Sequence, residues 1–548
     1  PPPPPPPPPL LRLRRPPRTT QSTSRRQRQM CIRDRAMTYP TNFFRPNQTG
    51  SFLEVIRTVN QCISQGESVF RWQGPQKSFA APGDLFFSSA TCGGTLAATE
   101  LSNLPESEVR YLCPLKPGRA ALLWDKSFLW GYMAVSALRD LGFSFDLLTS
   151  ETVRNQALKD YQVLFVPGGW ASLKSASLGA DGREELRRYV GGGGAYLGIC
   201  GGAGLALQVD EGLGLLPVSR KPMAERLPNF SGSIRVRQVS SHSLWWGLPG
   251  EAPFQVWWPS QFELVKPEKI QILGRYGDPE SDFCVSDLNV CETVAARLEW
   301  EQLEKAYQIN LNPERLANEP AIIAGEYGQG RVVLSYPHLE TPGDGAGNMA
   351  LFNIWHDLLS SSVLECADDS DGTRAANRVP VDEQSLERVR EMAREAENLV
   401  VLGERHNLWS WRNPWLLQWQ RGIRGAEFGT IAVLLQGLVR ELERTGGIAL
   451  TYPTPSSWKI DTKFEKLMEL WSLFRDKGRA LIKDEARNLN DKKVNNGETL
   501  SPRTRDLRTE IFSCVQCYGS KSYGGLYRQL LDQIDSLLLE TLLVRQFT

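Results

Sequence analysis

Short apolar runs alternate with amphipathic segments between residues 118 and 360. Four of these runs read as buried strands, at residues 120–124, 143–148, 163–166 and 195–199. Between them, apolar residues recur at helical spacing, and glycines stand where helices would end. Strands that alternate with helices predict a parallel sheet covered by helices on both faces. The pattern therefore predicts an α/β fold with a doubly wound sheet.

The pattern changes after residue 360. A charged, Asp-rich stretch predicts a linker at residues 361–382. Beyond it, four segments carry apolar residues at i, i+3 and i+4, which is typical of amphipathic helices: 384–399, 429–444, 463–486 and 527–544. We therefore expect a mostly helical domain over residues 383–548, a bundle in architecture. Its tryptophans are expected to pack between helices, unless they form an exposed cluster that marks a partner site: Trp409, Trp411, Trp415 and Trp419.

The N-terminal part gives less information. Residues 1–35 open with nine prolines and carry nine arginines, a composition that predicts disorder. Residues 30–35 read like a translated sequencing-adapter end, so we interpret residues 1–35 as an assembly artefact rather than a nucleic-acid-binding arm or a signal peptide. Residues 36–117 mix Gly, Ser and Pro, and the sequence predicts no fold for them.

Charge and cysteine content exclude several classes of function. The chain carries 63 basic and 62 acidic residues, so its charge gives no reason to expect nucleic acid or an anionic membrane as partner. No run reaches the roughly 18 apolar residues of a membrane span. Ten cysteines in 548 residues are too sparse for a disulfide scaffold and favour the reducing cytoplasm. Cys514 and Cys517 form a lone CxxC pair, so we expect no metal and no cofactor.

Cys200 is the first candidate for chemistry. It follows the strand at 195–199 and is followed by Gly201 and Gly202. A strand that enters a turn of small residues and then a helix holds the side chain at the carboxyl edge of the sheet, where open α/β folds bind ligands. The alternative is a small buried cysteine in a glycine-rich turn.

Two further strand ends carry candidate groups. Gly168 and Gly169 end the strand at 163–166, where backbone N–H groups could approach a substrate oxygen, as an oxyanion hole requires. His338 and Glu340 follow the strand at 331–336, and period two places both side chains on one face. A Cys nucleophile needs a base, and the base needs an orienting carboxylate. The alternatives are an ordinary turn and a solvated pair of loop residues.

Taken together, the three strand ends resemble the class I glutamine amidotransferase-like superfamily. Within it the chain is most similar to the domain at the N-terminus of some biotin-protein ligases, which also occurs as separate bacterial proteins. The matching text lies at residues 165–170, 192–202 and 328–340.

This resemblance implies a flavodoxin-like sheet over residues 118–360. It implies Cys200 as nucleophile, His338 as base and Glu340 as the residue that orients the histidine. It also implies substrate binding at the glycine turns, with the N–H groups of Gly169 and Gly201 as oxyanion donors beside Gly168.

The chain departs from the family pattern in two places. Glutamine-using members commonly carry Cys-x-Gly-x-Gln, whereas Gly204 stands at the last position here, which puts glutamine as substrate in doubt. The usual His-Pro-Glu is His338-Leu339-Glu340, which keeps both chemical groups. Residues 361–548 contain no Gly-Arg-Gly-rich biotin-binding text, so biotin ligation is not expected.

Four tryptophans lie between the nucleophile and the base, in the segments 242–246 and 254–258. They would form a pocket wall or lid near Cys200, or else the core of inserted strands. We interpret His242 as a structural loop residue rather than a second base.

Three functions stay open. The first is hydrolysis or transfer of a small-molecule amide through a Cys200 thioester, with ammonia passing to a partner enzyme or to water. The second is a Cys-His peptidase or other small-amide hydrolase. The third is a catalytically silent domain that binds a ligand or partner, with assembly through the helical C-terminal domain. An accessible Cys200 within reach of His338 favours catalysis, and a buried Cys200 or a blocked pocket favours the third.

Overall fold

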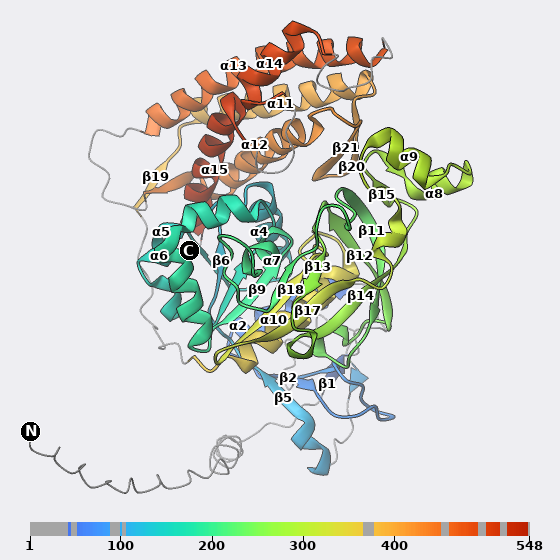
Figure 1. Cartoon of the computed structure of the whole chain (residues 1–548). Helices are drawn as coiled ribbons and strands as arrows, with labels where there is room; N and C mark the ends of the chain where they lie inside the picture. The colour runs from blue at the N-terminus through green and yellow to red at the C-terminus, as the bar shows by residue number, and fades with distance from the viewer. Residues whose placement is uncertain are drawn as a thin grey trace, which may run out of the picture.

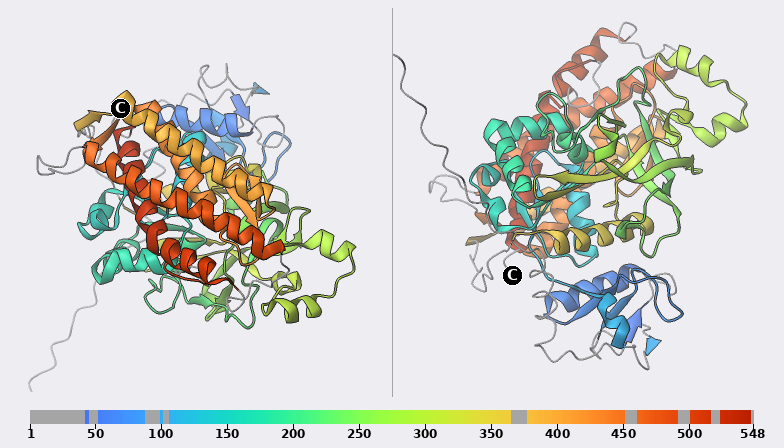
Figure 2. Two further views of the ribbon diagram at one scale, coloured as in Figure 1. Left: turned by 90° about the horizontal axis from the view of Figure 1, so that it is seen from above. Right: turned by 60° about the horizontal axis from the view of Figure 1, so that its bottom comes forward.

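The computed structural model describes residues 42–44, 52–87, 99–100, 106–364, 377–450, 460–490, 500–515 and 523–545. The tract 1–35 lies outside these ranges, as do Cys517 and the middle of the expected linker. A small N-terminal sheet lies at one end of the molecule, a large sheet with helices at its centre, and the C-terminal helices at the other end (Figures 1 and 2).

The central sheet has 11 strands, and five neighbouring strands of it are parallel to one another. The parallel strands are β6 (Ala120–Leu123), β7 (Asp146–Leu148), β8 (Val163–Val166), β9 (Ala195–Ile199) and β18 (Gly330–Ser335). Their spatial order is β7-β6-β8-β9-β18. In chain order this is 2-1-3-4-5, the flavodoxin-like arrangement, in which ligands bind where the strand order reverses, here between β6 and β8. The predicted α/β fold class is confirmed.

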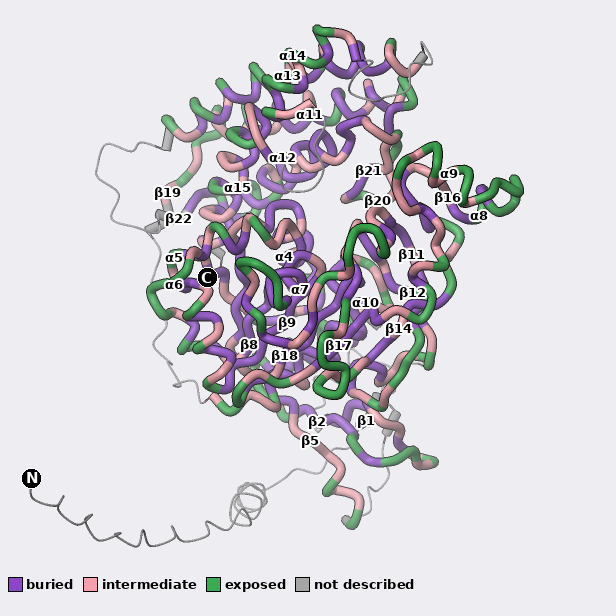
Figure 3. The backbone as a smooth tube through the Cα atoms, viewed as in Figure 1, coloured by how far each residue is buried: buried purple, intermediate pink, exposed green. Residues whose placement is uncertain are grey.

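Helices cover both faces of this parallel half. Neighbouring residues of β6 enter different cores: Leu122 packs on the side of α4 (Leu129–Asp140) and α10 (Gly345–Ser361), and Leu123 on the side of α6 (Ala171–Gly191). The strands are therefore buried along their length (Figure 3). This double cover explains why the strands read as continuous apolar runs.

The other half of the sheet is antiparallel. It is built from β11 (Phe230–Gln238), β12 (Glu251–Trp257), β14 (Gln271–Pro279), β15 (Cys284–Val285), β16 (Leu288–Asn289) and β17 (Pro320–Tyr327). β17 pairs with β18 and so joins the two halves. These strands lie between Cys200 and His338 in the chain. The end of β12 places Trp257 beside Cys200, at the carboxyl edge of the parallel strands.

The region 36–117, for which the sequence predicted no fold, contains an antiparallel sheet of order β4-β1-β3-β2-β5. Its strands are β1 (Asn42–Phe44), β2 (Val69–Trp72), β3 (Leu85–Phe87), β4 (Thr99–Glu100) and β5 (Leu112–Leu115), with the helix α2 (Phe52–Ser64). Asn60 of α2 donates to the Leu141 carbonyl at 2.8 Å, and its Oδ1 lies 2.9 Å from Nε2 of His356 in α10. These buried bonds tie the region to the central domain.

The C-terminal part is mostly helical, as expected. Its long helices are α11 (Glu383–Arg405), α12 (Gly425–Thr445), α13 (Ile460–Asn490), α14 (Pro502–Phe512) and α15 (Gly525–Arg545). The segment from Trp409 to Trp419 forms a hairpin of β20 (Trp409–Asn413) and β21 (Leu416–Trp419), which the sequence did not predict. Trp409 packs on a helix as expected, stacked on Phe428 of α12 at 5.2 Å, whereas Trp419 packs on Trp258 of the central domain. Asn413 makes the turn by accepting from the backbone N–H groups of Trp415 and Leu416, both at 2.9 Å. A second strand pair, β19 (Asn377–Pro380) with β22 (Gly447–Leu450), lies at the start of α11.

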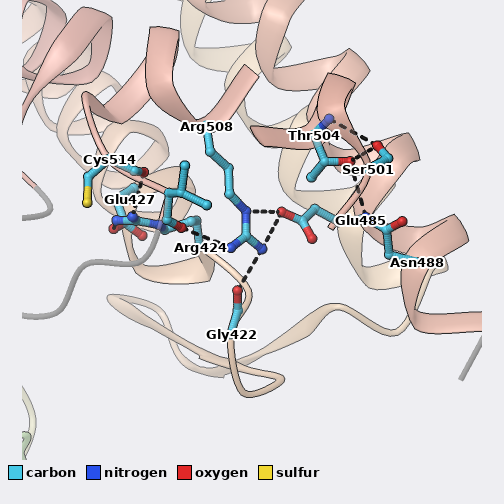
Figure 4. Close-up of polar contacts among 10 residues, drawn as sticks. Gly422, Arg424, Glu427, Glu485, Asn488, Ser501, Thr504, Arg508 and Cys514 are labelled. Carbon is cyan, nitrogen blue, oxygen red and sulfur yellow. Dashed lines mark hydrogen bonds and ion pairs between the residues drawn. The ribbon is translucent and has the colours of Figure 1, made fainter. Parts of the chain in front are cut away.

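A buried polar cluster fixes α14 in this part (Figure 4). Arg508 donates from Nε to Glu485 of α13 at 2.7 Å and from Nη2 to the Gly422 carbonyl at 2.8 Å. Both charged side chains are almost fully buried. Arg424 pairs with Glu427 beside them at 3.1 Å. The cluster connects α13 and α14 to the segment of Gly422 and Arg424, which follows the hairpin.

Candidate active site

Cys200 occupies a strained turn between β9 and α7 (Gly201–Ala206). Its φ is +50° and its ψ −103°, a conformation that costs a non-glycine residue about 1–3 kcal/mol. Its N–H donates to the Ser335 carbonyl at the end of β18, at 2.7 Å. The turn therefore holds the half-buried thiol at the carboxyl edge of the sheet, in the manner of a nucleophile elbow.

The two glycine turns predicted from the sequence lie against each other. A Cβ atom on Gly201 would stand 1.7 Å from the Gly169 carbonyl oxygen, so only glycine fits there. Gly169 has a φ of +106°, which also favours glycine. A Cβ atom on Gly168 would lie 3.0 Å from Cε1 of His338. The structure thus brings Gly168, Gly169 and Gly201 together beside the histidine.

His338 and Glu340 form a fully buried pair in the loop after β18. The Nδ1 atom of His338 lies 2.8 Å from Oε1 of Glu340, and both side chains are 0% exposed. Burial by itself lowers the pKa of His338, but the Glu340 carboxylate and Cys200 outweigh it and raise the pKa to about 10. The His338 backbone N–H donates to Gln255 of β12 at 2.8 Å, which fixes the loop.

The other ring nitrogen of His338 is available for chemistry. Among the described residues, Nε2 makes no hydrogen bond of full geometry. Cys200 raises the pKa of His338 both by its charge and by a side-chain hydrogen bond, so the thiol lies within reach of this nitrogen. A free Nε2 beside a thiol, with Nδ1 on a carboxylate, is the arrangement that proton transfer at Cys200 requires.

Tryptophans cover this site. The Trp130 ring lies 4.7 Å from the His338 ring, between ring centroids. Trp258 stacks between Trp130, at 6.4 Å, and Trp419 of the β21 strand, at 4.7 Å. The Trp257 carbonyl lies 4.0 Å from the Cys200 sulfur. Of the four tryptophans noted in the sequence, Trp257 and Trp258 therefore face the site.

The other two tryptophans and His242 lie elsewhere. Trp245 donates to the Leu273 carbonyl at 2.8 Å, and Trp246 packs over Arg71. His242 accepts a backbone hydrogen bond from Leu244 at 3.1 Å, as expected for a structural loop residue.

The helical part closes the remaining space. A cavity of about 30 Å³ lies beside Gly169, bounded by the loops after β6 and β8 and by helices α12 and α15. Its lining residues are Phe128, Leu129, Trp130, Gly169, Trp170, Thr430, Tyr527 and Leu531. This volume holds little more than a water molecule. Cys200 does not line the cavity, and its own side chain is half-buried.

Sequence reasoning missed a second polar group next to Gly169. Lys174 of α6 donates to the Ser127 hydroxyl, and both side chains are 0% exposed. Trp130 was missed as well. No sequence signal marked these residues, because the close approach of the loop after β6 to that after β8 depends on strand order.

Three observations bear on other classes of site. Within the described ranges, no helix is long and apolar enough to cross a membrane. No group of three or more His, Cys, Asp or Glu among the described residues could hold a metal ion. Cys62 and Cys514 each take part in a disulfide bond.

Comparisons with known proteins were made for the sequence and the structure. No family model and no curated protein matches the chain. Among solved structures, a ThuA-like protein of Bacteroides uniformis is 13% identical, with a TM-score of 0.31, over 45% of this chain and 93% of its own. A GMP synthase protein of Thermoplasma acidophilum is 14% identical, with a TM-score of 0.28, over 44% and 96%. A glutamine amidotransferase of Thermotoga maritima is 14% identical, with a TM-score of 0.26, over 44% and 83%. Similarity this low carries no argument about activity or site residues.

Proposed function

We propose that the protein is a class I glutamine amidotransferase-like enzyme that cleaves a small amide through a thioester on Cys200. One observation carries the proposal: a cysteine in a strained strand-to-helix turn stands beside a buried His338–Glu340 pair whose Nε2 is free. The motif resemblance points to the same chemistry. Its finer part, the likeness to the biotin-protein ligase domain, rests on the sequence motifs alone.

The steps follow from these groups. The Cys200 proton resides on Nε2 of His338, and the Cys200 thiolate attacks the amide carbon. The oxyanion accepts hydrogen bonds from the N–H groups of Gly169 and Gly201. The carbon–nitrogen bond then breaks, and the nitrogen leaves as ammonia with the proton from His338. Water, deprotonated by His338, hydrolyses the thioester and restores the thiol. Glu340 orients the imidazole and stabilises the imidazolium.

The site also limits the substrate. Gly204 offers no side chain at the position where glutamine-using members carry Gln. His338 and Glu340 are fully buried beneath Trp130, so substrate access to Nε2 of His338 requires that the tryptophan cover move. We place a small amide other than glutamine first among the substrates.

Alkylation tests the nucleophile directly. Cys291 is exposed and serves as an internal reference within the same protein. We expect iodoacetamide to label Cys200 faster than Cys291 below about pH 7, because a neighbouring imidazolium favours the thiolate. His338→Gln should remove this advantage without changing Cys291 labelling. Equal pH profiles for the two cysteines, unchanged by His338→Gln, would reject the proposal.

A silent binding domain is the second candidate. The observation that favours it is the burial of the His338–Glu340 pair, with both side chains at 0% exposure. In that case the helical part would serve a protein partner, and Cys200 would label no faster than Cys291. The same experiment therefore separates the two candidates.

A further inference from the structure

Lys174 is a buried cation without an anionic partner. It lies in the first turn of α6 and is 0% exposed. Its Nζ contacts the Ser127 hydroxyl and, at 3.5 Å, the Asp125 carbonyl. Within the described part of the chain it forms no ion pair. Burial of an unpaired ammonium is costly, and the start of a helix disfavours a cation. A buried ammonium that costs this much stability is a candidate for a functional role.

The charged groups around Lys174 are occupied or neutralised. Asp125, in the loop after β6, accepts from the Ser150 N–H at 2.7 Å and from the Ser177 hydroxyl at 3.3 Å. Asp535 approaches from α15, but burial and the nearby Asp125 raise its pKa well above the usual range. Cys200 approaches from the start of α7.

The charge state of Lys174 changes near neutrality. Burial lowers its pKa to about 7, although Asp125, Asp535 and Cys200 oppose the shift. Lys174 is therefore mostly an ammonium below about pH 7 and mostly a neutral amine above it.

Lys174 is joined to the nucleophile by direct packing through Gly169. Its Cε lies 3.5 Å from the position that a Cβ atom on Gly169 would take. The Gly169 carbonyl in turn lies against Gly201. The Lys126 carbonyl oxygen and the Ser127 Cα atom lie beside the same Cβ position of Gly169, at 2.7 and 3.6 Å.

The loop that carries Ser127 is strained. Lys126 and Phe128, on either side of Ser127, have φ values of +57° and +49°. Strain of this kind persists where the surrounding structure enforces it, often at functional sites. The loop and Gly169 follow β6 and β8, the two strands between which the strand order reverses and open α/β folds bind ligands.

We propose that Lys174 is a positioning residue of the reaction, an ammonium held by Ser127 beneath Gly169 that strengthens the oxyanion hole at Gly169 and Gly201. A fixed positive charge in a water-excluded site stabilises the negative oxygen that develops during attack. Lys174 keeps its proton throughout and adds no covalent step. This inference rests on the proposed function of Cys200 as nucleophile.

Two reactions of Cys200 distinguish an effect of Lys174 on the oxyanion hole from an effect of Lys174 on the ionisation of the thiol. Acetylation by p-nitrophenyl acetate passes through a tetrahedral oxyanion, forms a carbon–sulfur bond and releases p-nitrophenolate. Alkylation by iodoacetamide displaces iodide and forms no oxyanion. Both rates scale with the amount of thiolate, so the ratio of acetylation to alkylation reports the oxyanion hole. Peptide mass spectrometry measures both at Cys200.

The expected change in the ratio of acetylation to alkylation has a definite direction. In the wild type the ratio should fall about tenfold between about pH 6 and pH 8.5, because Lys174 loses its charge in this window. Lys174→Met should lower the ratio about tenfold at about pH 6 and make it independent of pH. Lys174→Arg keeps its charge and should give a high, flat ratio. Lys159→Met, at an exposed lysine, is the matched control and should behave as the wild type.

Two further measurements keep the test decisive. If Lys174→Met does not fold, Ser127→Ala removes the holding hydroxyl and should lower the ratio about threefold at about pH 6. A flat wild-type ratio, or Lys174→Met equal to the wild type at low pH, overturns the role of Lys174 while rapid Cys200 alkylation still supports the nucleophile. If Cys200 labels no faster than Cys291, the proposed function fails and the role of Lys174 falls with it.

Discussion

The carbonyl oxygen of Gly169 lies 1.7 Å from the position that a Cβ atom on Gly201 would occupy. The loop after β8 and the turn after β9 are thus in backbone contact, with no room for a side chain. Cys200 and the glycine turn behave as one unit because neither can move without the other.

The first prediction concerns this contact. Gly201→Ala should destabilise the fold by about 1–3 kcal/mol, since a methyl group forces the two loops apart. It should also slow Cys200 alkylation relative to Cys291. Gly345→Ala is the control, because a Cβ atom there meets nothing within 4 Å, and it should leave both properties unchanged. Urea unfolding measures the stability, and a Gly201→Ala protein as stable as the wild type would contradict the packing.

The second prediction concerns pH. His338 has a pKa of about 10 in the folded protein, above the usual 6.5. A raised histidine pKa adds stability that is complete below about pH 6.5 and is lost as the pH rises toward 10. The free energy of unfolding should therefore fall by at least about 1.4 kcal/mol between pH 7 and pH 10.

Glu340→Gln removes the main group that raises this pKa. The decline with pH should then become shallower, and the alkylation profile of Cys200 should shift with it. Thermal unfolding at a series of pH values measures the slope. An equal slope in Glu340→Gln and wild type would show that the pair does not hold an imidazolium.

The third prediction concerns the cover of the site. Trp419 stacks on Trp258, which packs against Trp130 beside His338. Trp419→Ala should open this stack and raise the rate of Cys200 alkylation several-fold, at a cost of about 0.5–1.5 kcal/mol for the lost ring pair. Trp471→Ala, which removes a ring pair with Phe474 within α13, is the control. A loss of stability with no change in alkylation would mean that this stack does not guard Cys200.

The fourth prediction concerns the helical part. Arg508→Met leaves Glu485 buried without its partner and should cost about 3–5 kcal/mol. Arg487→Met breaks an ion pair whose arginine is 70% exposed and should cost less than about 1 kcal/mol. The double variant Arg508→Met with Glu485→Leu should recover most of the loss. Urea unfolding of the three variants checks the order.

The residues explain which parts of the fold were readable from the sequence. Strands β6, β8 and β9 are covered on both faces, so their apolar runs are continuous, and those of β8 and β9 lead into glycine turns. The tryptophans of 409–419 were expected to pack between helices, and the strands that they form were not predicted. The turn at Asn413 and the pairing of Trp409 with Trp419 turn them into a hairpin. The N-terminal sheet was not predicted because polar residues or proline interrupt most of its short strands, such as Asn42, Arg71 and Pro114, so no continuous apolar run marks them.

The sequence by itself determined the α/β class and the chemical groups at three strand ends, since local periodicity and glycine turns are written in neighbouring residues. Only the tertiary structure decided that Trp130 covers His338, that Lys174 lies beneath Gly169 and that α12 and α15 close the cavity. These relations join segments up to hundreds of residues apart, and strand order and side-chain packing fix them. No local pattern carries that information.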